Sequence, residues 1–156
     1  MHSLGLPQIF GENGSLSRGS GRFEHRSDQQ EMAQAVAGTL RDGGYLVVEA
    51  GTGTGKTLAY LVPALLAEGP VVIATGTKAL QDQIVERELP IAMHAIGSTR
   101  RVEVLKGRDN YLCRKRLDEA SSQPVLDNRF EIPLLESIRR WAAHTSTGDR
   151  SEIGDL

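Results

Sequence analysis

The stretch that decides the fold is VVEAGTGTGKTLAYL (residues 47–61), in which an apolar run leads through alternating Gly and Thr to a Lys-Thr pair. Residues 45–48 (YLVV) are apolar and β-rich without polar alternation, which is typical of a strand buried on both faces of a parallel sheet. The apolar residues after Thr57 predict a helix to about Glu68. Pro63 is expected to bend this helix rather than end it.

The loop between this strand and this helix has the composition of a phosphate-binding loop. The motif needs a small residue, four free positions and then Gly-Lys-Thr, and Ala50 stands here where Gly is usual. Glycine lets the backbone turn so that successive amides face phosphate oxygens, and the positive end of the following helix adds to the attraction. The residues predicted to bind nucleotide are Ala50, Gly51, Thr52, Gly53, Thr54, Gly55, Lys56 and Thr57.

Two residues of this loop have predicted catalytic roles. Lys56 would reach the β- and γ-phosphates of a nucleoside triphosphate, and the Thr57 hydroxyl would hold Mg²⁺. The alternative is a glycine-rich turn between strand and helix, with Lys56 merely exposed. The strand-to-helix context favours phosphate binding, although the loop alone does not separate kinases, transporters and motor ATPases.

The neighbouring segments extend the same alternation of strands and helices. A helix is expected to begin at Ser27, with its hydroxyl as the cap, and to end at Gly43. Residues 70–75 and 101–107 are predicted strands, and residues 78–89 are a predicted helix that Pro90 halts. This order indicates the α/β class, with the parallel sheet of a P-loop NTPase.

The ends of the chain differ from this central part. Residues 1–22 are rich in Gly and Ser without periodicity, and are predicted to be a flexible tail. Beyond Gly107 come a basic segment, a polar stretch and a predicted helix over about residues 132–144, with an apolar face that includes Leu134. With no apolar run long enough for a bilayer and no leader sequence, the 156-residue chain is expected to be cytoplasmic, without a membrane partner.

Binding residues are also predicted on both flanks of the loop. Arg26 and Gln29 precede the first strand, and a glutamine amide can donate to and accept from an adenine edge, which would select ATP. Alone, such a pair is more often a solvated surface, but its position before the loop favours nucleotide. Thr75, Thr77 and Lys78 lie where a strand ends and a helix begins, which suits either a nucleic-acid phosphate or a simple helix cap.

Four motifs in this order, RSDQQEM, VVEAGTGTGKT, ATGTKALQDQI and LKGRDNYLC, resemble the start of the DinG/XPD group of superfamily 2 DNA helicases, nearest to the bacterial DinG and YoaA type. The resemblance implies that residues 23–106 are the first part of a RecA-like motor domain and residues 107–156 the start of an iron–sulfur insert. The implied activity is Mg²⁺-dependent ATP hydrolysis coupled to 5′-to-3′ movement on single-stranded or forked DNA, in repair or replication.

The same resemblance makes Cys113 the first of four ligands of a [4Fe-4S] cluster. It is the one cysteine of the chain, so the cluster would exist only in a longer parent protein. Lys106 and Arg108 lie near it, and with Arg114, Lys115 and Arg116 they would give a positive rim for a DNA backbone. The alternative for residues 114–116 is a solvated basic helix.

The second ATPase motif, an Asp-Glu pair at the end of a buried strand, is missing. Asp118-Glu119 matches its letters, but the pair follows a basic amphipathic stretch and is predicted to lie on a helix surface. We therefore interpret the chain as an N-terminal fragment that binds ATP without fast hydrolysis. The alternatives are an inactive module for ATP and single-stranded DNA, or another P-loop NTPase such as a small kinase. A truncated sheet would expose apolar surface, which predicts poor solubility or partial disorder.

Overall fold

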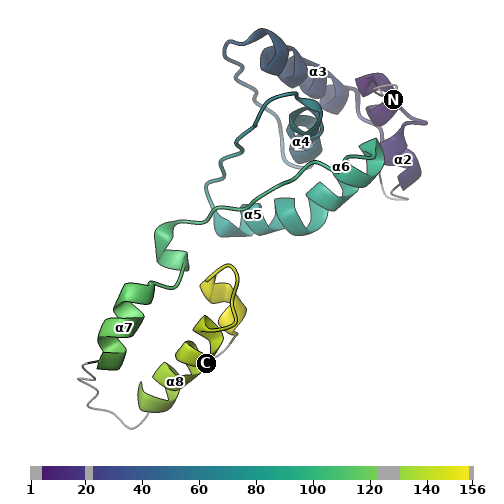
Figure 1. Cartoon of the computed structure of the whole chain (residues 1–156). Helices are drawn as coiled ribbons and strands as arrows, with labels where there is room; N and C mark the ends of the chain where they lie inside the picture. Colours follow the sequence, from purple (N-terminus) through teal and green to yellow (C-terminus); the bar gives the residue numbers. More distant parts are fainter. Residues whose placement is uncertain (1–4, 20–22, 123–130, 155–156) are drawn as a thin grey trace. The chain divides into compact units, whose positions relative to one another are not determined.

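The computed structural model describes residues 5–19, 23–122 and 131–154, which fall into two compact units, Met1–Glu103 and Val104–Leu156. Helices make up the regular structure of both units (Figure 1). The first unit contains α1 (Leu6–Phe10), α2 (Ser15–Gly19), α3 (Ser27–Asp42), α4 (Lys56–Leu66), α5 (Lys78–Gln83), the π-helical η1 (Ile84–Glu88) and α6 (Leu89–Ile96).

Helix α4, which follows the predicted phosphate loop, is the centre of the first unit. It packs against α3 and α6 (Figure 1). It continues past Pro63, as expected, and ends at Leu66, before the predicted end near Glu68. Because neighbours cover it on several sides, most of its residues are buried, and each fully buried Leu or Val contributes roughly 1.5–3 kcal/mol. The buried residues are Leu58, Ala59, Leu61, Val62, Pro63, Ala64 and Leu65.

Helix α3 has the predicted ends but not the predicted cap. It runs from Ser27 to Asp42, and Gly43 follows it with a φ of 78°. The Ser27 hydroxyl lies 3.3 Å from an oxygen of Asp28, and no side chain caps the helix. The capping role given to Ser27 is therefore wrong, because Arg26 occupies the cap position and Ser27 is already helical.

The prediction of a flexible tail over residues 1–22 is wrong for residues 6–19. These residues form α1 and α2, which contact α3 and α6 respectively. Ile9, Phe10 and Leu16 are fully buried in the core, and the Phe10 carbonyl lies 2.7 Å from His25 Nδ1. Three apolar residues among many Gly and Ser give no periodic signal, yet they are enough to anchor two short helices.

Pro90 does not halt the helix that begins at Lys78. The chain stays helical through η1 into α6, where Pro90 lies in the first turn. In this π-helical turn the Leu89 amide donates to the Ile84 carbonyl, five residues back. Pro90 has no amide hydrogen to donate, and the π-helical turn before it accommodates the proline, so the helix continues to Ile96 and ends at Gly97, whose φ is 62°.

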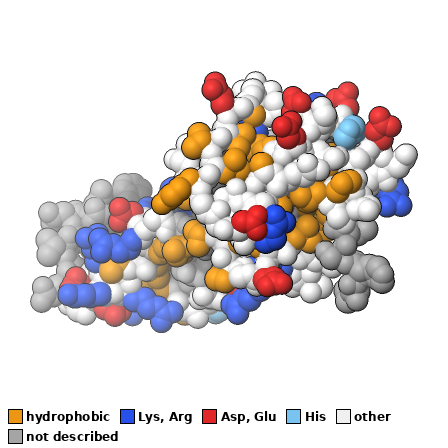
Figure 2. All heavy atoms as spheres, turned by 90° about the horizontal axis from the view of Figure 1, so that it is seen from above, with side chains coloured by type: hydrophobic (Ala, Val, Ile, Leu, Met, Phe, Trp, Pro, Cys, Tyr) orange, Lys and Arg blue, Asp and Glu red, His pale blue; other side chains and the backbone are white. Residues whose placement is uncertain are grey.

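The parallel sheet is not formed within the described residues. The segments predicted as strands, residues 45–48, 70–75 and 101–107, are neither helix nor strand there. Tyr45, Val47 and Val72 are more than 90% exposed, since a strand buries its faces only when neighbouring strands and covering helices are present. Figure 2 shows several patches of exposed hydrophobic side chains on one face of the molecule. The predicted poor solubility stays a prediction.

The second unit contains η2 (Arg108–Asn110), α7 (Arg114–Ser122), α8 (Glu131–Ala142) and η3 (Arg150–Ile153). Helix α8 confirms the predicted helix near residues 132–144. Its Leu135, Ile138 and Trp141 are half-buried, but Leu134 is exposed, so that residue is wrongly placed on the apolar face. In the described part of the chain, no helix is both long and apolar enough to cross a membrane.

Candidate functional site

The predicted phosphate loop turns through two glycines into α4. Gly53 and Gly55 have φ values of 81° and 76°, in the left-handed region that glycine adopts without steric cost. Gly55 is the N-cap of α4, and no side chain caps that end. The N-cap therefore offers the first amides of α4 no side-chain acceptor, and the helix dipole makes this end attractive to an anion.

The Lys56 side chain closes this loop on itself. Its ammonium donates to the carbonyls of Ala50, at 2.8 Å, and Gly51, at 2.5 Å. The Thr54 hydroxyl donates to the same Gly51 carbonyl at 3.0 Å. A lysine ammonium has three donors, and a charged phosphate oxygen is a stronger acceptor than a neutral carbonyl. An entering phosphate can therefore take over these contacts. Thr57, the predicted Mg²⁺ ligand, is half-buried in the first turn of α4.

Arg26 and Gln29 also lie at this loop, but they contact its backbone. Gln29 is 4% exposed, and its amide nitrogen donates to the Gly55 carbonyl at 2.9 Å. A Cβ built on Gly55 would lie 2.2 Å from that nitrogen, so the close approach requires glycine. The Arg26 guanidinium donates to the Gly53 carbonyl and pairs with Glu24 at 3.1 Å.

Sequence reasoning did not find this loop-holding role. The motif accounts for glycine at position 55 by the positive φ that the loop requires. It does not reveal that glycine is also needed there for the close approach of Gln29. The structure thus brings the predicted nucleotide residues of α3 and the loop together, while adenine recognition by Arg26 and Gln29 stays a prediction. Lys56 and Thr57 as catalytic residues likewise stay predictions.

Thr75 and Thr77, predicted to contact nucleic acid, lie after the second predicted strand and take part in a helix cap. Thr77 is the N-cap of α5, and its hydroxyl accepts from the Leu80 amide at 3.2 Å. The Thr75 hydroxyl donates to the Thr77 carbonyl at 3.2 Å. Lys78 is exposed in the first turn. These contacts fit the simpler of the two interpretations, a capped helix, and DNA contact by these residues stays a prediction.

Lys106 and Arg108, the second group of predicted DNA contacts, have different surroundings, because only Lys106 is in a poorly exposed ion pair. Lys106 Nζ lies 2.7 Å from an Asp149 carboxylate oxygen, and the two side chains are 14% and 15% exposed. Arg108, in contrast, is exposed in η2. A cation neutralised by a carboxylate is a poor phosphate contact, so this pair argues against Lys106 in that role.

Asp149 is a residue that sequence reasoning missed. The Lys106 ammonium is the main cause that lowers the pKa of its carboxyl from 3.8 to about 2, and the Ser151 amide and hydroxyl add to it. The hydroxyls of Thr147 and Thr145 lower the pKa of Glu152. The residues around Asp149 give no local signal of this role, because the ion pair joins segments far apart in the sequence.

The described residues alone form neither a metal site nor the second ATPase motif. Cys113 is a free, exposed thiol, and the described ranges hold no cluster of three His, Cys, Asp or Glu residues that could bind a metal. One thiolate cannot supply a four-cysteine cluster. Asp118 and Glu119 are exposed on α7, as predicted for a pair without a catalytic role.

These features are those of the phosphate-binding-loop class of proteins: a glycine loop leads into a helix, and a lysine side chain contacts the loop carbonyls. Residues 26–126 match the family model of the DEAD/DEAH box helicases, and the chain belongs to this family. The match includes the loop, Arg26 and Gln29.

Three named relatives are similar over most of this chain. The ATP-dependent DNA helicase YoaA of Haemophilus influenzae is 44% identical over 97% of the chain and 24% of its own length. YoaA of Escherichia coli is 44% identical over 91% of the chain and 22% of its length. The ATP-dependent helicase DinG of Mycobacterium tuberculosis is 40% identical over 82% of the chain and 22% of its length. The chain thus spans about a quarter of these relatives. No solved structure matches it.

Proposed function

We propose that the protein is an ATP-dependent DNA helicase of the DinG/YoaA type and that this chain supplies its nucleotide-binding loop. The observation that carries the proposal is the Gly55–Lys56 turn, in which the N-cap has no side chain and the Lys56 ammonium donates to two neutral carbonyls. The names of the relatives, ATP-dependent DNA helicases, support the same activity.

In this proposal the ATP phosphates take the place of the Ala50 and Gly51 carbonyls at the Lys56 ammonium. Thr57 would hold Mg²⁺. Gln29 holds the loop through the Gly55 carbonyl, and its amide oxygen would accept from adenine. Arg26 acts with Gln29. Mg²⁺ supplies charge neutralisation of the phosphates.

The parallel sheet belongs to the same proposal. We infer that residues 45–48, 70–75 and 101–107 become its strands when further strands pair beside them. Their exposed apolar side chains support this, because such side chains gain free energy by burial. The break after Glu103 lies close to the proposed border between a motor domain (residues 23–106) and an insert (residues 107–156).

The remaining features follow from the family. Cys113 would be one ligand of a [4Fe-4S] cluster, completed by cysteines outside this chain. Movement would run 5′ to 3′ on single-stranded or forked DNA in repair or replication, in the cytoplasm. The proposed DNA contacts are Thr75, Thr77, Lys78 and Arg108.

Nucleotide binding is tested by titrating ATP into the chain and into Lys56→Ala. We expect the substitution to weaken binding by about 10- to 100-fold, since a hydrogen bond to a charged group contributes roughly 1.5–3 kcal/mol. Lys78→Ala, an exposed lysine on α5, is the matched control and should leave the affinity unchanged. Unchanged binding by Lys56→Ala would show that the loop is not the nucleotide site.

Helicase activity is tested by strand separation with the whole protein, ATP and a forked DNA. ATP binding without turnover or unwinding would favour the second candidate, an inactive module for ATP and single-stranded DNA. The exposed position of Asp118 and Glu119 on α7 favours that candidate for the chain alone. Iron content of Cys113→Ser in the whole protein tests the cluster.

A further inference from the structure

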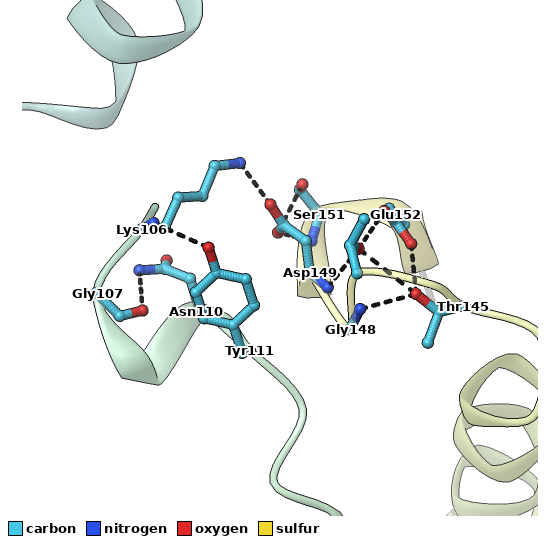
Figure 3. Close-up of polar contacts among 10 residues, drawn as sticks. Lys106, Gly107, Asn110, Tyr111, Thr145, Gly148, Asp149, Ser151 and Glu152 are labelled. Atoms are coloured by element: carbon cyan, nitrogen blue, oxygen red, sulfur yellow. Dashed lines mark hydrogen bonds and ion pairs between the residues drawn. The ribbon is translucent and has the colours of Figure 1, made fainter. Parts of the chain in front are cut away.

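The loop of residues 145–152, which follows α8, is organised by its own side chains. The Thr145 hydroxyl accepts from the Gly148 amide at 2.9 Å, and the Thr147 hydroxyl accepts from the Asp149 amide at 2.9 Å. Both hydroxyls donate to the Glu152 carboxylate, which closes the loop (Figure 3). Because these contacts are internal, the loop keeps its shape without a ligand.

This loop also holds a segment that is distant in sequence, residues 106–112. The Lys106 ammonium pairs with Asp149, and the Leu112 amide donates to the Gly148 carbonyl at 2.8 Å. Tyr111 and Asp149 form an isolated antiparallel bridge. The Tyr111 hydroxyl accepts from the Lys106 amide at 2.9 Å, so the side chain and the backbone of Lys106 are both fixed (Figure 3).

Asp149 is the centre of these contacts. Its carboxylate accepts from Lys106, and also from the amide and the hydroxyl of Ser151 at 2.9 and 2.8 Å. The nearby pair Lys115–Glu119 has the same charges, but its atoms are 3.7 Å apart and its side chains are 84% and 63% exposed. An ion pair screened from water interacts more strongly than an exposed one, so the two pairs should differ in strength.

We propose that Asp149 is a positioning residue that, through Lys106 and the adjoining Gly148 carbonyl, fixes residues 106–112 and so the course of the chain into Cys113 and α7. No ligand is needed for this role, and it holds whether or not Cys113 binds iron. It goes beyond the proposed helicase activity, because it assigns residues 145–152 a function and takes Lys106 out of the DNA-contacting set.

The direct test is hydrogen exchange of the Leu112 amide in the full chain. Asp149→Asn and Lys106→Met should each speed exchange by 10-fold or more, whereas Lys106→Arg, which keeps the charge, should retain most of the protection. The double variant Lys106→Met with Asp149→Asn should exchange no faster than the worse single variant, because both remove one interaction. Glu119→Gln, the exposed pair, is the control and should leave exchange unchanged.

The outcomes separate the proposal from its alternatives. Unchanged exchange in Asp149→Asn, or additive effects in the double variant, would overturn it. If Lys106→Met fails to fold, a folded and protected Lys106→Arg supports the ion pair, while an equally unfolded Lys106→Arg counts against it.

Salt dependence of single-stranded DNA binding gives a second readout. Arg108→Met should lower the slope of log affinity against log salt by about 1, while Lys106→Met should leave it unchanged. An equal drop in slope for Lys106→Met would return Lys106 to the DNA contacts and overturn its assignment here. Absence of DNA binding by the unchanged protein would count against the proposed function alone, and the exchange result would stand.

Discussion

The two units of the chain are held together by different forces. The first, Met1–Glu103, contains every buried hydrophobic residue of the described core, gathered around α4. The described part of the second, Val104–Leu156, has no buried side chain and relies on hydrogen bonds and the Lys106–Asp149 pair. Apolar burial does not titrate, whereas a carboxylate–ammonium pair does. The units should therefore respond to different perturbations.

The two lysines that sequence patterns linked to phosphate show the same contrast. Lys56 contacts neutral carbonyls, which a phosphate can replace with a gain in electrostatic energy. Lys106 contacts a carboxylate, and breaking a poorly exposed ion pair to reach another anion offers no such gain. The partner of a lysine, rather than its position near a motif, decides whether it is available to a ligand.

The largest effect is expected from the apolar side of this comparison. Phe10→Ala should destabilise the first unit by about 3–5 kcal/mol, because it removes a fully buried ring from a close-packed core. Urea denaturation followed by far-UV circular dichroism measures this loss of stability. Hydrogen exchange of the Leu112 amide, in the second unit, should not change. Gln8→Ala, exposed in the same helix, should stay within about 0.5 kcal/mol. A loss below about 1 kcal/mol for Phe10→Ala would restore the flexible-tail interpretation.

The sequence predicts the elements whose signal is local. The start of α4 after Gly55 and the end of α3 at Gly43 follow from glycine conformation and helical periodicity. The N-terminal helices were missed because Ile9, Phe10 and Leu16 are anchored by contacts with α3 and α6, and no local pattern encodes such contacts. Pro90 does not end the helix as predicted, because the π-helical turn before it accommodates a proline that a regular helix would not.

The candidate site was predictable as a set of residues but not as a set of contacts. The motif identified Lys56, and the upstream pattern identified Gln29. Neither shows that Gln29 binds the Gly55 carbonyl, because that contact depends on how α3 packs against α4. The Lys106–Asp149 pair joins two segments far apart in sequence, so only the folded chain reveals it.

Gly55→Ala tests whether the close approach of Gln29 matters beyond glycine's φ. We expect a loss of about 2–3 kcal/mol in stability and weaker ATP binding, since a Cβ adds both left-handed strain and a clash with the Gln29 amide. Gly97→Ala has a similar φ of 62° with open space around it, and should cost only the strain, about 1 kcal/mol. Adding Gln29→Ala to Gly55→Ala removes the clash, so thermal denaturation should show a stability loss close to that of Gly97→Ala. No such recovery would mean that the positive φ alone accounts for the need for glycine at position 55.

Acid pH tests the polar side of the comparison. The pKa of Asp149 in the folded chain, about 2, lies below its ordinary value of 3.8. The stability that ionised Asp149 contributes is therefore complete above pH 3.8 and is lost as the pH falls through the folded pKa. The loss, roughly 1–2 kcal/mol after allowance for residual exposure, should appear in the second unit between about pH 4 and pH 2. Glu152, whose pKa is also lowered, adds in the same direction.

Hydrogen exchange of Leu112 against pH measures this effect, and Asp149→Asn should flatten the profile. The core amides of α4 serve as the internal reference, because apolar burial has no titrating group at its centre. A profile that keeps its full amplitude in Asp149→Asn would place the acid sensitivity on another carboxylate and weaken the contrast between the units.

The smallest effect concerns a polar contact inside the apolar unit. The Arg100 guanidinium donates to the Ala67 and Gly69 carbonyls at the end of α4, where a positive charge also meets the negative end of the helix dipole. Arg100→Ala should cost about 1 kcal/mol in urea denaturation. Arg101→Ala, whose side chain is 88% exposed beside Glu103, should cost less than about 0.5 kcal/mol. Equal losses for the two arginines would show that the end of α4 is held by packing alone, and that the first unit needs no polar contact at this point.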